Sequence, residues 1–435
     1  MDFRLSEQTQ EWKDYCRKFA REVIRPAAPQ HDRDESVPYE IVAQAYDWKL
    51  AGLDWLAALQ DDPEGLKGVI YAEELHWGCA GIALAISASS LCAAGIAASG
   101  TPEQIGHWVP QVFGTKEEFR LGAYAVTEPQ AGSDVKSLRT TAKRDGDDWI
   151  LNGTKTFISN GGIADVTIVV ATVDAELGHR GQASFVVTKD NPGLKLGKKE
   201  SKLGIRASQT AEIVLEDCRV PGDALLGGEE KLQKKLDRAR SGAPSGASGA
   251  LATFEITRPT VGASALGIAQ AAYEWTLAYL SERTEDGKPL TQHQRIQQVM
   301  ADVATEIEAA RLLVWRAAWM GRNGVPMSGG QGSMSKLKGG DVAMWATTTL
   351  MDLVGPFAQS QDCPLEKFFR DAKIYQIFEG TAQIQRLVIA RMQTADYADR
   401  LELAKQVAAP TNGKVTEQAP GNAPSERPAA AVGAA

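Results

Sequence analysis

The stretch Trp149-Ile-Leu-Asn-Gly-Thr-Lys-Thr-Phe-Ile-Ser159 decides the fold class, because here the apolar period changes from that of a helix to two. Two strand-like runs, residues 149–151 and 154–159, flank Asn152-Gly153, and an Asn-Gly pair in that position predicts a tight β-hairpin. Similar runs occur at residues 121–126, 166–171, 183–188 and 211–215. Several short strands at this spacing predict a compact β barrel or sandwich.

Helical periodicity lies on both sides of this β region. Long segments with that period, at residues 262–283, 293–322, 335–354 and 383–392, predict a four-helix bundle, and residues 240–251 read as a flexible Gly/Ser/Ala insertion before it. The expected fold is therefore α+β, with an N-terminal all-α domain at 1–120, a middle β domain at 121–225, a C-terminal helical bundle domain at 226–405 and a disordered tail at 406–435. No GxGxxG follows a strand, so a Rossmann dinucleotide site is not expected.

The bulk composition is that of an ordinary globular protein. The net charge of −8 over 435 residues and the pI near 5.4 argue against nucleic acid or an anionic membrane as the main partner. The longest apolar run, residues 81–98, is rich in small residues and is expected to form a tightly packed buried helix, short of a membrane span. Five widely spaced cysteines without CxxC predict free thiols in the cytoplasm, with neither disulfides nor a metal site.

Three segments carry residue types suited to chemistry. In the loop after residues 121–126, Thr127 and Ser133 could bond a polar ring and a phosphate, although an ordinary solvent loop has the same turn residues. Phe157 and Ser159 point to one face of a strand, either beside a ligand ring or as a core Phe with a surface Ser. Glu379 lies just before a helix, either buried by a ligand or simply favoured there by the helix dipole.

These segments, in this order, resemble the acyl-CoA dehydrogenase family over nearly the whole chain before the tail. The most specific motifs are Tyr124-Ala-Val-Thr-Glu-Pro with Ala131-Gly-Ser-Asp134, Lys202-Leu-Gly-Ile-Arg-Ala-Ser-Gln-Thr210, Thr257-Arg-Pro259, and the run from Arg370 to Gln385. The resemblance implies an FAD-dependent oxidoreductase of fatty acid or lipid catabolism. Its reaction would be α,β-dehydrogenation of an acyl-CoA thioester to the trans-2-enoyl-CoA.

The resemblance also implies roles for individual residues. Those that would contact FAD within one chain are Tyr124, Val126 and Thr127 along the isoalloxazine ring, Phe157, Ile158 and Ser159 on its other side, and Thr381 and Gln383 at the phosphates or ribityl end. Ser133 is expected near both cofactor and CoA. The remaining residues that would contact the acyl-CoA are Glu255, Thr257, Arg258 and Gly380.

Glu379 falls on the position of the family's catalytic base. It would take the α-proton while flavin N5 accepts the β-hydride. The developing enolate-like charge needs donors at the thioester oxygen, in the family the backbone N–H of the base and a ribityl hydroxyl. Burial by the acyl chain should raise the pKa of Glu379. Thr257 stands where some members carry a glutamate base, and Glu255 is the lesser candidate.

Two departures concern the part of the FAD site that family members complete with a neighbouring subunit. Asp286 replaces a Phe in Arg283-Thr-Glu-Asp-Gly-Lys288, and Asp352-Leu-Val-Gly355-Pro356 replaces Gln-x-x-Gly-Gly, while His293 and Gln294 remain. Acidic side chains close to a pyrophosphate should weaken its binding. The expected assembly is therefore a homotetramer that tolerates local variation, or a mixed α2β2 tetramer with degraded FAD contacts.

The resemblance leaves the electron acceptor and the acyl chain open. An electron-transferring flavoprotein is the expected acceptor, since acyl-CoA oxidases of this superfamily usually carry an extra helical domain. A non-enzymatic, FAD-poor subunit of a mixed complex is a further alternative, against which the intact Glu379, Thr127 and Ser159 argue. Short, branched, aromatic and steroid side-chain thioesters all remain candidate substrates.

Overall fold

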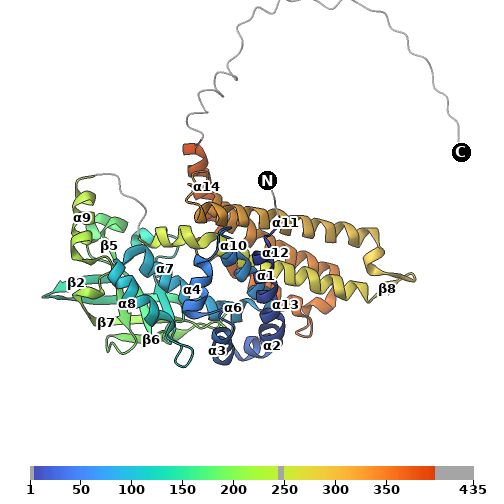
Figure 1. Ribbon diagram of the computed structural model, residues 1–435, viewed down its shortest axis with the longest axis horizontal. Helices are drawn as coiled ribbons and strands as arrows, with labels where there is room; N and C mark the ends of the chain where they lie inside the picture. Colours follow the sequence, from blue (N-terminus) through green and yellow to red (C-terminus); the bar gives the residue numbers. More distant parts are fainter. Residues whose placement is uncertain (1–3, 243–248, 397–435) are drawn as a thin grey trace, which may run out of the picture. The chain divides into compact units, whose positions relative to one another are not determined.

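The computed structural model describes residues 4–242 and 249–396, of which residues 249–256 and 395–396 are described by their backbone alone. Residues Met1–Gln393 form one compact unit, and the fold described below is that of this unit. The predicted tail and most of the predicted 240–251 insertion lie outside the described residues. In Figure 1 strands β2, β5, β6 and β7, all within residues 141–221, lie at one end of the unit, and the long helices α11 (Gln294–Arg322) and α12 (Gln331–Val354) extend toward β8 (Thr284–Glu285) at the other.

The N-terminal part is helical. Ser6 caps the first helix by accepting a hydrogen bond from the Thr9 N–H (3.3 Å), and Thr101 with Gln104 forms a capping box on the last. The helices are α1 (Glu7–Phe19), a π-helical turn (Ala20–Ile24), α2 (Arg25–Asp34), α3 (Tyr39–Asp47), α4 (Gly52–Gln60), α5 (Lys67–Gly78), α6 (Ala80–Ser87), α7 (Ser89–Ser99) and α8 (Pro102–Phe113).

The prediction for the apolar run at residues 81–98 is wrong in two respects. The structure has two helices there, α6 and α7, which join at Ala88. The continuous stretch Ala80–Ser99 has 20 residues and is long and apolar enough to cross a membrane by length and composition alone. Within the protein 61% of it is buried, with Ile82 and Ala83 in one core and Cys92 and Ile96 in another. Its apolar surface is thus used largely for internal packing.

Seven strands form one branched sheet. In the order β1-β4-β2-β3-β7-β6, β1 and β4 are parallel and β5 pairs antiparallel with β4. One face is filled by a core that includes Trp149, Leu151 and Phe185, while Tyr124 and Val126 belong to a second core with residues of α7 and α8. The strands are β1 (Gly122–Ala125), β2 (Thr141–Asp145), β3 (Asp148–Ser159), β4 (Val166–Thr172), β5 (Gln182–Thr188), β6 (Leu194–Lys199) and β7 (Thr210–Pro221).

The predicted hairpin at Asn152-Gly153 is wrong, because β3 runs through it without turning. The actual β2–β3 turn lies at residues 146–147, with Gly146 at φ +62°. Asn152 sits at an irregularity in the pairing with β7, where its side-chain oxygen accepts from the Asp217 N–H (2.8 Å). A Cβ at Gly153 would lie 2.5 Å from Thr140 Oγ1, so this glycine permits a close approach between strands and makes no turn.

The C-terminal part is built around α10. This helix packs against α12, α11 and also α5 of the N-terminal part. Gly262 and Gly339 let α10 and α12 approach closely, since a Cβ on Gly339 would lie 2.6 Å from the Gly262 carbonyl oxygen. The elements are α9 (Gly228–Arg240), α10 (Gly249–Ser281), β8 (Thr284–Glu285), β9 (Lys288–Pro289), α11 (Gln294–Arg322), α12 (Gln331–Val354), α13 (Pro364–Ala372) and α14 (Ala382–Asp396).

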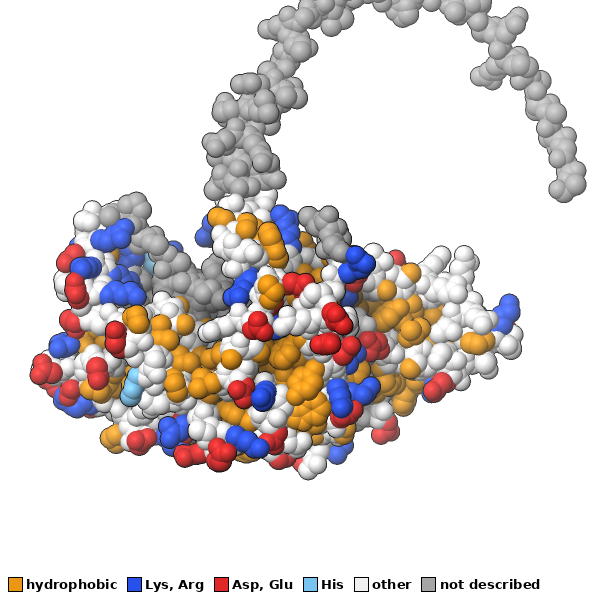
Figure 2. Space-filling model, in the orientation of Figure 1, with side chains coloured by type: hydrophobic (Ala, Val, Ile, Leu, Met, Phe, Trp, Pro, Cys, Tyr) orange, Lys and Arg blue, Asp and Glu red, His pale blue; other side chains and the backbone are white. Residues whose placement is uncertain are grey.

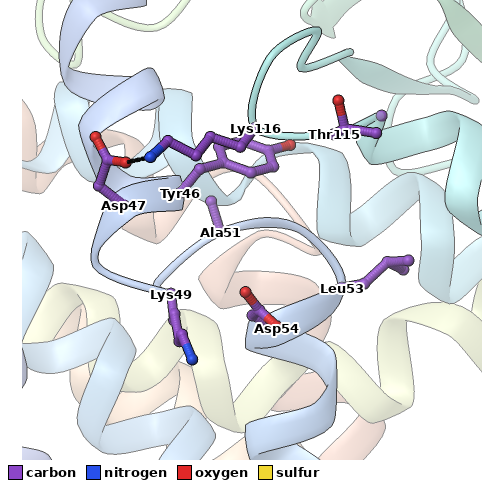
Figure 3. A pocket seen from close by; sticks show the side chains of 9 residues that line it. Tyr46, Asp47, Lys49, Ala51, Leu53, Asp54, Thr115 and Lys116 are labelled. Atoms are coloured by element: carbon purple, nitrogen blue, oxygen red, sulfur yellow. Dashed lines mark ion pairs between the residues drawn. The ribbon is translucent and has the colours of Figure 1, made fainter.

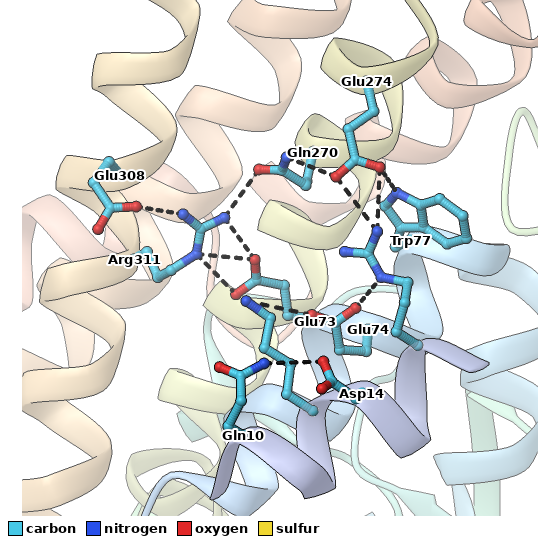
Figure 4. A network of polar contacts seen from close by, with 11 residues as sticks. Gln10, Asp14, Glu73, Glu74, Trp77, Gln270, Glu274, Glu308 and Arg311 are labelled. Atoms are coloured by element: carbon cyan, nitrogen blue, oxygen red, sulfur yellow. Dashed lines mark hydrogen bonds and ion pairs between the residues drawn. The ribbon is translucent and has the colours of Figure 1, made fainter. Parts of the chain in front are cut away.

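A polar network joins the N-terminal helices to this bundle (Figure 4). Arg17 of α1 pairs with Glu74 of α5 and lies 3.2 Å from the Glu274 carboxylate of α10, and Arg311 of α11 lies 2.7 Å from the Glu73 carboxylate. Because three of these groups are largely buried, the pairs fix the orientation of α5 against α10. On the face shown in Figure 2, acidic and basic side chains are intermingled.

Candidate active site

Glu379 lies in a short connection between a 3-10 turn (Lys373–Gln376) and α14, as the sequence predicts. Its backbone has φ +51° and Gly380 follows at +95°, so two consecutive residues are left-handed. Such a conformation costs a non-glycine residue about 1–2 kcal/mol. Thr381 then accepts a hydrogen bond from the Ile384 N–H (3.2 Å) and starts α14. The carboxylate is therefore held on a sharp turn between two helices.

The Glu379 carboxylate is partly buried and meets α10. Its Oε2 accepts a hydrogen bond from the Thr257 hydroxyl at 2.7 Å. Burial raises the pKa of Glu379 above its ordinary value, while the Thr257 hydrogen bond and the charges of Lys336 and Arg258 offset part of that rise. A raised pKa suits a carboxylate that must both accept and release a proton near neutral pH.

The charges of two cations, Arg258 and Lys336, act on this carboxylate. Arg258 is buried, and its guanidinium donates to the Ser333 hydroxyl of α12 (3.1 Å). Lys336, also of α12, is almost fully buried and donates to the Gly380 carbonyl oxygen at 2.8 Å. The sequence indicates Arg258 through the Thr257-Arg-Pro259 motif. Lys336 was missed, and the small residues around it in α12 were the available signal that a long side chain could be enclosed there.

The residues that stand together with Glu379 form the carboxylate cluster. Gln385 of α14 completes it by donating to the carbonyl oxygens of Glu379 and Gly380, each at 3.2 Å. The side chain of the alternative base, Glu255, lies outside the described residues, although its backbone belongs to α10. The members of the carboxylate cluster are Glu379, Gly380, Thr257, Arg258, Lys336 and Gln385.

Phe157 stands out on the sheet because 64% of it is exposed and its backbone has φ +56°. A bulge in the β3–β7 pairing lies between Lys155 and Ile158, and the Thr156 N–H donates to the Thr127 carbonyl (2.9 Å). The two segments predicted to flank the flavin are thus adjacent. Ile158 is buried and Ser159 is half-buried opposite Thr210.

A buried ion pair connects the Phe157 segment to the adjacent segment that contains Thr127. Glu128 and Lys155 lie 2.8 Å apart with almost no exposed surface, and Lys155 also donates to the Val126 carbonyl at 2.9 Å. The Glu128 carboxylate further accepts from the N–H groups of Arg139 (2.6 Å) and Thr140 (2.9 Å). Sequence reasoning missed this pair. The signal was a lysine at an inward position of β3, which requires a partner.

Five other residues predicted to bind the cofactor differ in how far their side chains are buried. The side chains of Tyr124 and Val126 are buried in the core shared with α7 and α8. Thr127 is half-buried at the start of the following loop, Ser133 is exposed in it, and Gln383 is exposed in the first turn of α14. Among these five residues, Thr127 and Val126 are bonded to the Phe157 segment, through their carbonyl oxygens.

A second group of predicted residues lies away from Glu379. Arg283 stacks on Tyr279 at 3.2 Å from the ring centroid, Tyr279 stacks on Phe357, and His293 Nε2 lies 3.1 Å from the Glu285 carbonyl oxygen. We call this group the far cluster, with members Arg283, Asp286, His293, Gln294, Asp352 and Gly355. Its cofactor-binding role stays a prediction.

The motif from Lys202 to Thr210 serves as a connection between the sheet and α13. The Ile205 N–H donates to the Asp371 carboxylate (2.6 Å), which also pairs with Lys367. A Cβ at Gly204 would lie 2.3 Å from the Arg370 carbonyl oxygen. Arg370 and Asp371 begin the segment that leads to Glu379, so this contact positions the segment against the sheet.

A pocket of about 430 Å³ opens elsewhere, between the α3–α4 turn and residues 114–116. Figure 3 shows Asp47 paired with Lys116 at its rim and Tyr46 within it. None of the residues predicted to bind cofactor or substrate lines this pocket. It therefore does not belong to the candidate active site.

Comparison with known proteins agrees with the three-part fold of the chain. The acyl-CoA dehydrogenase N-terminal, middle and C-terminal domain models match residues 6–116, 123–218 and 245–394 respectively. The chain belongs to the acyl-CoA dehydrogenase family and is an oxidoreductase of that family. Members of the family are FAD flavoproteins, as predicted from the resemblance.

Individual relatives match over nearly their whole length. The chain is 39% identical over 394 residues to cyclohexane-1-carbonyl-CoA dehydrogenase from Geobacter metallireducens, covering 89% of this chain and 98% of the relative. Butyryl-CoA dehydrogenase from Megasphaera elsdenii has a similar solved structure, with TM-score 0.80, 35% identity and coverage of 90% and 99%. A chain in the structure described as the electron transferring flavoprotein of Acidaminococcus fermentans matches with TM-score 0.79, 35% identity and the same coverage.

Proposed function

We propose that this chain dehydrogenates an acyl-CoA thioester to the trans-2-enoyl-CoA, with Glu379 as the base that removes the α-proton. One observation carries the assignment: a carboxylate with a raised pKa, bonded to Thr257, stands on a strained turn of a chain that belongs to this family. The turn and the hydrogen bond fix the carboxylate before substrate arrives, which is the geometric requirement for efficient proton transfer.

The residues of the sheet fit a flat cofactor. Phe157 presents most of an aromatic side chain to solvent in a left-handed backbone, an arrangement expected where a ligand covers the ring. Thr127 and Ser159 supply hydroxyls on the two adjacent segments, and the Glu128–Lys155 pair holds those segments together. FAD, when bound there, would accept the β-hydrogen of the acyl chain as a hydride.

The decisive experiment follows flavin bleaching after thioester addition. Glu379→Gln should lower the rate by about 10²–10⁴-fold, the usual contribution of a general base, while CoA-ester binding is largely kept. Glu306→Gln is the matched control, because Glu306 is a glutamate of α11 that pairs with Lys338 at the surface. Continued turnover by Glu379→Gln would move the base elsewhere, with Glu255 as the next residue to replace.

We propose that the acyl chain be identified with a panel that begins with butyryl-CoA and cyclohexanecarbonyl-CoA. Two relatives are named for these acyl groups. The ratio of kcat/KM between the straight and the cyclic substrate measures how well the pocket accepts bulk at the β-carbon. A flat response across the panel would contradict a dedicated pocket for either acyl group.

We propose an electron-transferring flavoprotein as the acceptor, a partner class that the name of one similar structure supports. The alternative is an oxidase that passes electrons to O₂. Turnover with an artificial acceptor and little peroxide release is the expected result, and stoichiometric peroxide would establish the oxidase instead. A cytoplasmic location remains a prediction, supported by five buried cysteines that are all free thiols.

The far cluster supports a multi-subunit assembly. We propose that it completes the FAD site of a second subunit, in a homotetramer or in a mixed α2β2 tetramer. One FAD per subunit in a homogeneous preparation of this chain would exclude the mixed assembly. A preparation that takes up FAD only after a second subunit is added would exclude the homotetramer.

A further inference from the structure

Lys336 is a buried ammonium group to which the family resemblance assigns no role. It lies near the start of α12, has 1% of its surface exposed, and donates to the Gly380 carbonyl oxygen at 2.8 Å. A lysine loses several kcal/mol of hydration when it is buried, so the enclosing structure must supply compensating contacts. The contact that it makes is with the turn carrying Glu379.

That turn requires support from outside itself. Glu379 and Gly380 are both left-handed, and a Cβ at Gly380 would lie 2.4 Å from Gln385 Nε2. Local structure does not stabilise this geometry, since a glutamate prefers right-handed backbone. Two side chains hold it: Gln385 from α14 bonds both carbonyl oxygens, and Lys336 from α12 bonds the second. Of these two side chains, Lys336 is the charged one.

The charges that face Lys336 come from three elements. Glu379 precedes α14, Arg258 belongs to α10, and Asp341 lies on α12 itself. Asp341 is already engaged with Arg386 (2.6 Å) and with the Gln376 amide (2.8 Å). Glu379, by contrast, has no Lys or Arg nitrogen of the described residues within 4.0 Å. Lys336 therefore acts on Glu379 through space, and it is the cation bonded to the adjacent carbonyl.

We infer that Lys336 is a positioning residue for the catalytic base: its ammonium fixes the Glu379–Gly380 turn through the Gly380 carbonyl and, by its charge, keeps the Glu379 carboxylate ionised. The inference rests on the proposed role of Glu379. It adds a residue on a helix that bears none of the groups assigned to proton removal. No bond is made or broken by Lys336 in this role.

A pH dependence follows from the two groups. Burial lowers the pKa of Lys336 to about 8, although Glu379 and Asp341 counteract part of the effect. The raised pKa of Glu379 sets an acid limb, since the carboxylate must be deprotonated to act. Above about pH 8 the loss of the Lys336 proton weakens the charge-assisted hydrogen bond to the Gly380 carbonyl, so the turn is held less firmly although the carboxylate itself stays ionised. The profile of kcat/KM should thus be bell-shaped, with Glu379 on the acid side and Lys336 on the alkaline side.

The test uses FAD-loaded full-length enzyme with Lys336→Met, Lys336→Arg and the control Lys338→Met. Lys338 lies two residues further along α12 and pairs with Glu306 at the surface. Lys336→Met should move the acid limb up by about one pH unit, a roughly tenfold loss of kcat/KM at acidic pH. Lys336→Arg should keep the acid limb and lose the alkaline one, because arginine stays charged. The control should match the native profile.

Hydrogen exchange supplies a readout that is independent of catalysis. Peptides covering residues 377–385 should exchange faster in Lys336→Met than in the native enzyme, and at the native rate in Lys338→Met. Native exchange together with a native acid limb in Lys336→Met would overturn the inference. If Lys336→Met does not fold, an alkaline limb that persists in Lys336→Arg overturns it. A failure of Glu379 as base would instead appear as turnover by Glu379→Gln, with the exchange result unaffected.

Discussion

The carboxylate cluster and the far cluster are held in opposite ways. Glu379 is bonded by Thr257 of α10, and its turn by Lys336 of α12, so distant segments converge on one carboxylate. In the far cluster, Arg283 bonds Tyr279 four residues earlier and His293 meets Glu285 eight residues earlier. The first cluster is held mainly by distant segments, whereas the bonds of Arg283 and His293 in the more exposed second cluster are made to residues nearby in sequence.

The two clusters lie near opposite ends of α11. Helix α11 starts directly after His293, and the segment after its end is bonded to α14 through Gln393 and Gly329. Its 29 residues at about 1.5 Å each span roughly 43 Å. Figure 1 shows β8 beyond the start of α11 and α14 beside its end. Arg283 therefore does not reach Glu379 of the same chain.

The largest effect on the free energy of unfolding is expected when the buried charge of Lys155, near Phe157, is removed. Lys155→Met leaves the Glu128 carboxylate buried without its cation, which should cost about 3–5 kcal/mol of unfolding free energy. Chemical denaturation of the FAD-loaded enzyme measures it. Lys143→Met on the exposed side of β2 is the control. An equal loss of unfolding free energy in this control would show that the buried ion pair stabilises the fold no more than an exposed lysine does.

The same ion pair should make the free energy of unfolding decrease at acid pH. Burial alone would raise the pKa of Glu128, but Lys155 and the N–H groups of residues 139 and 140 lower it to about 2. A folded-state pKa below the unfolded value of about 4.3 means that this contribution is complete above pH 4.3 and is lost as the pH falls toward about 2. In Lys155→Met that acid dependence should weaken.

An intermediate effect is expected at the hydroxyl that touches the base. Thr257→Val removes a hydrogen bond that lowers the pKa of Glu379, so the acid limb of kcat/KM should rise by about one pH unit. The alkaline limb should stay in place because Lys336 is untouched. Thr305→Val, at an exposed threonine of α11, is the matched control. An equal loss of kcat/KM at every pH would indicate that the substitution disturbs packing and does not act through the hydrogen bond.

Two Xaa-Gly pairs show why a turn cannot be assigned from the local sequence alone. Asn152-Gly153 has the composition of a hairpin turn but lies inside β3, because Gly153 is needed for close packing on Thr140. Asp286-Gly287 was not recognised as a turn, but it is the turn between β8 and β9, with φ +51° and +73°, and its predicted effect on cofactor binding stays a prediction. Turn propensity is local, and only tertiary contacts decide which pair turns.

The site shows the same division. The placement of Glu379 just before α14 could be predicted because a family motif contains it, while the roles of Glu379, Arg258 and the Phe157 segment stay predictions. The partners of Lys336 and Lys155 could not be predicted, since each buried lysine is met by a carbonyl or carboxylate from a distant segment. The helical, β and helical order followed from periodicity alone, whereas the branched strand order depends on long-range pairing that periodicity does not encode.

The smallest effect is expected in the far cluster, at Asp286. Asp286→Asn keeps a residue that tolerates positive φ and removes one exposed negative charge. If the far cluster faces a neighbour's FAD, the affinity for FAD should rise about 2–5-fold, the worth of one exposed charge contact. Titration of the apo-assembly with FAD measures it, with Asp54→Asn on α4 as the control.

Salt separates the electrostatic explanation from a structural one. Exposed charges are screened beyond about 10 Å at 0.1 M salt, so the gain in Asp286→Asn should shrink steadily as ionic strength rises. A gain that persists in high salt would have to come from the turn, because Asn and Asp differ there in charge and not in backbone demand. No change at any salt concentration would mean that Asp286 does not face the cofactor of any subunit, and that the exposed charges of the far cluster serve another purpose.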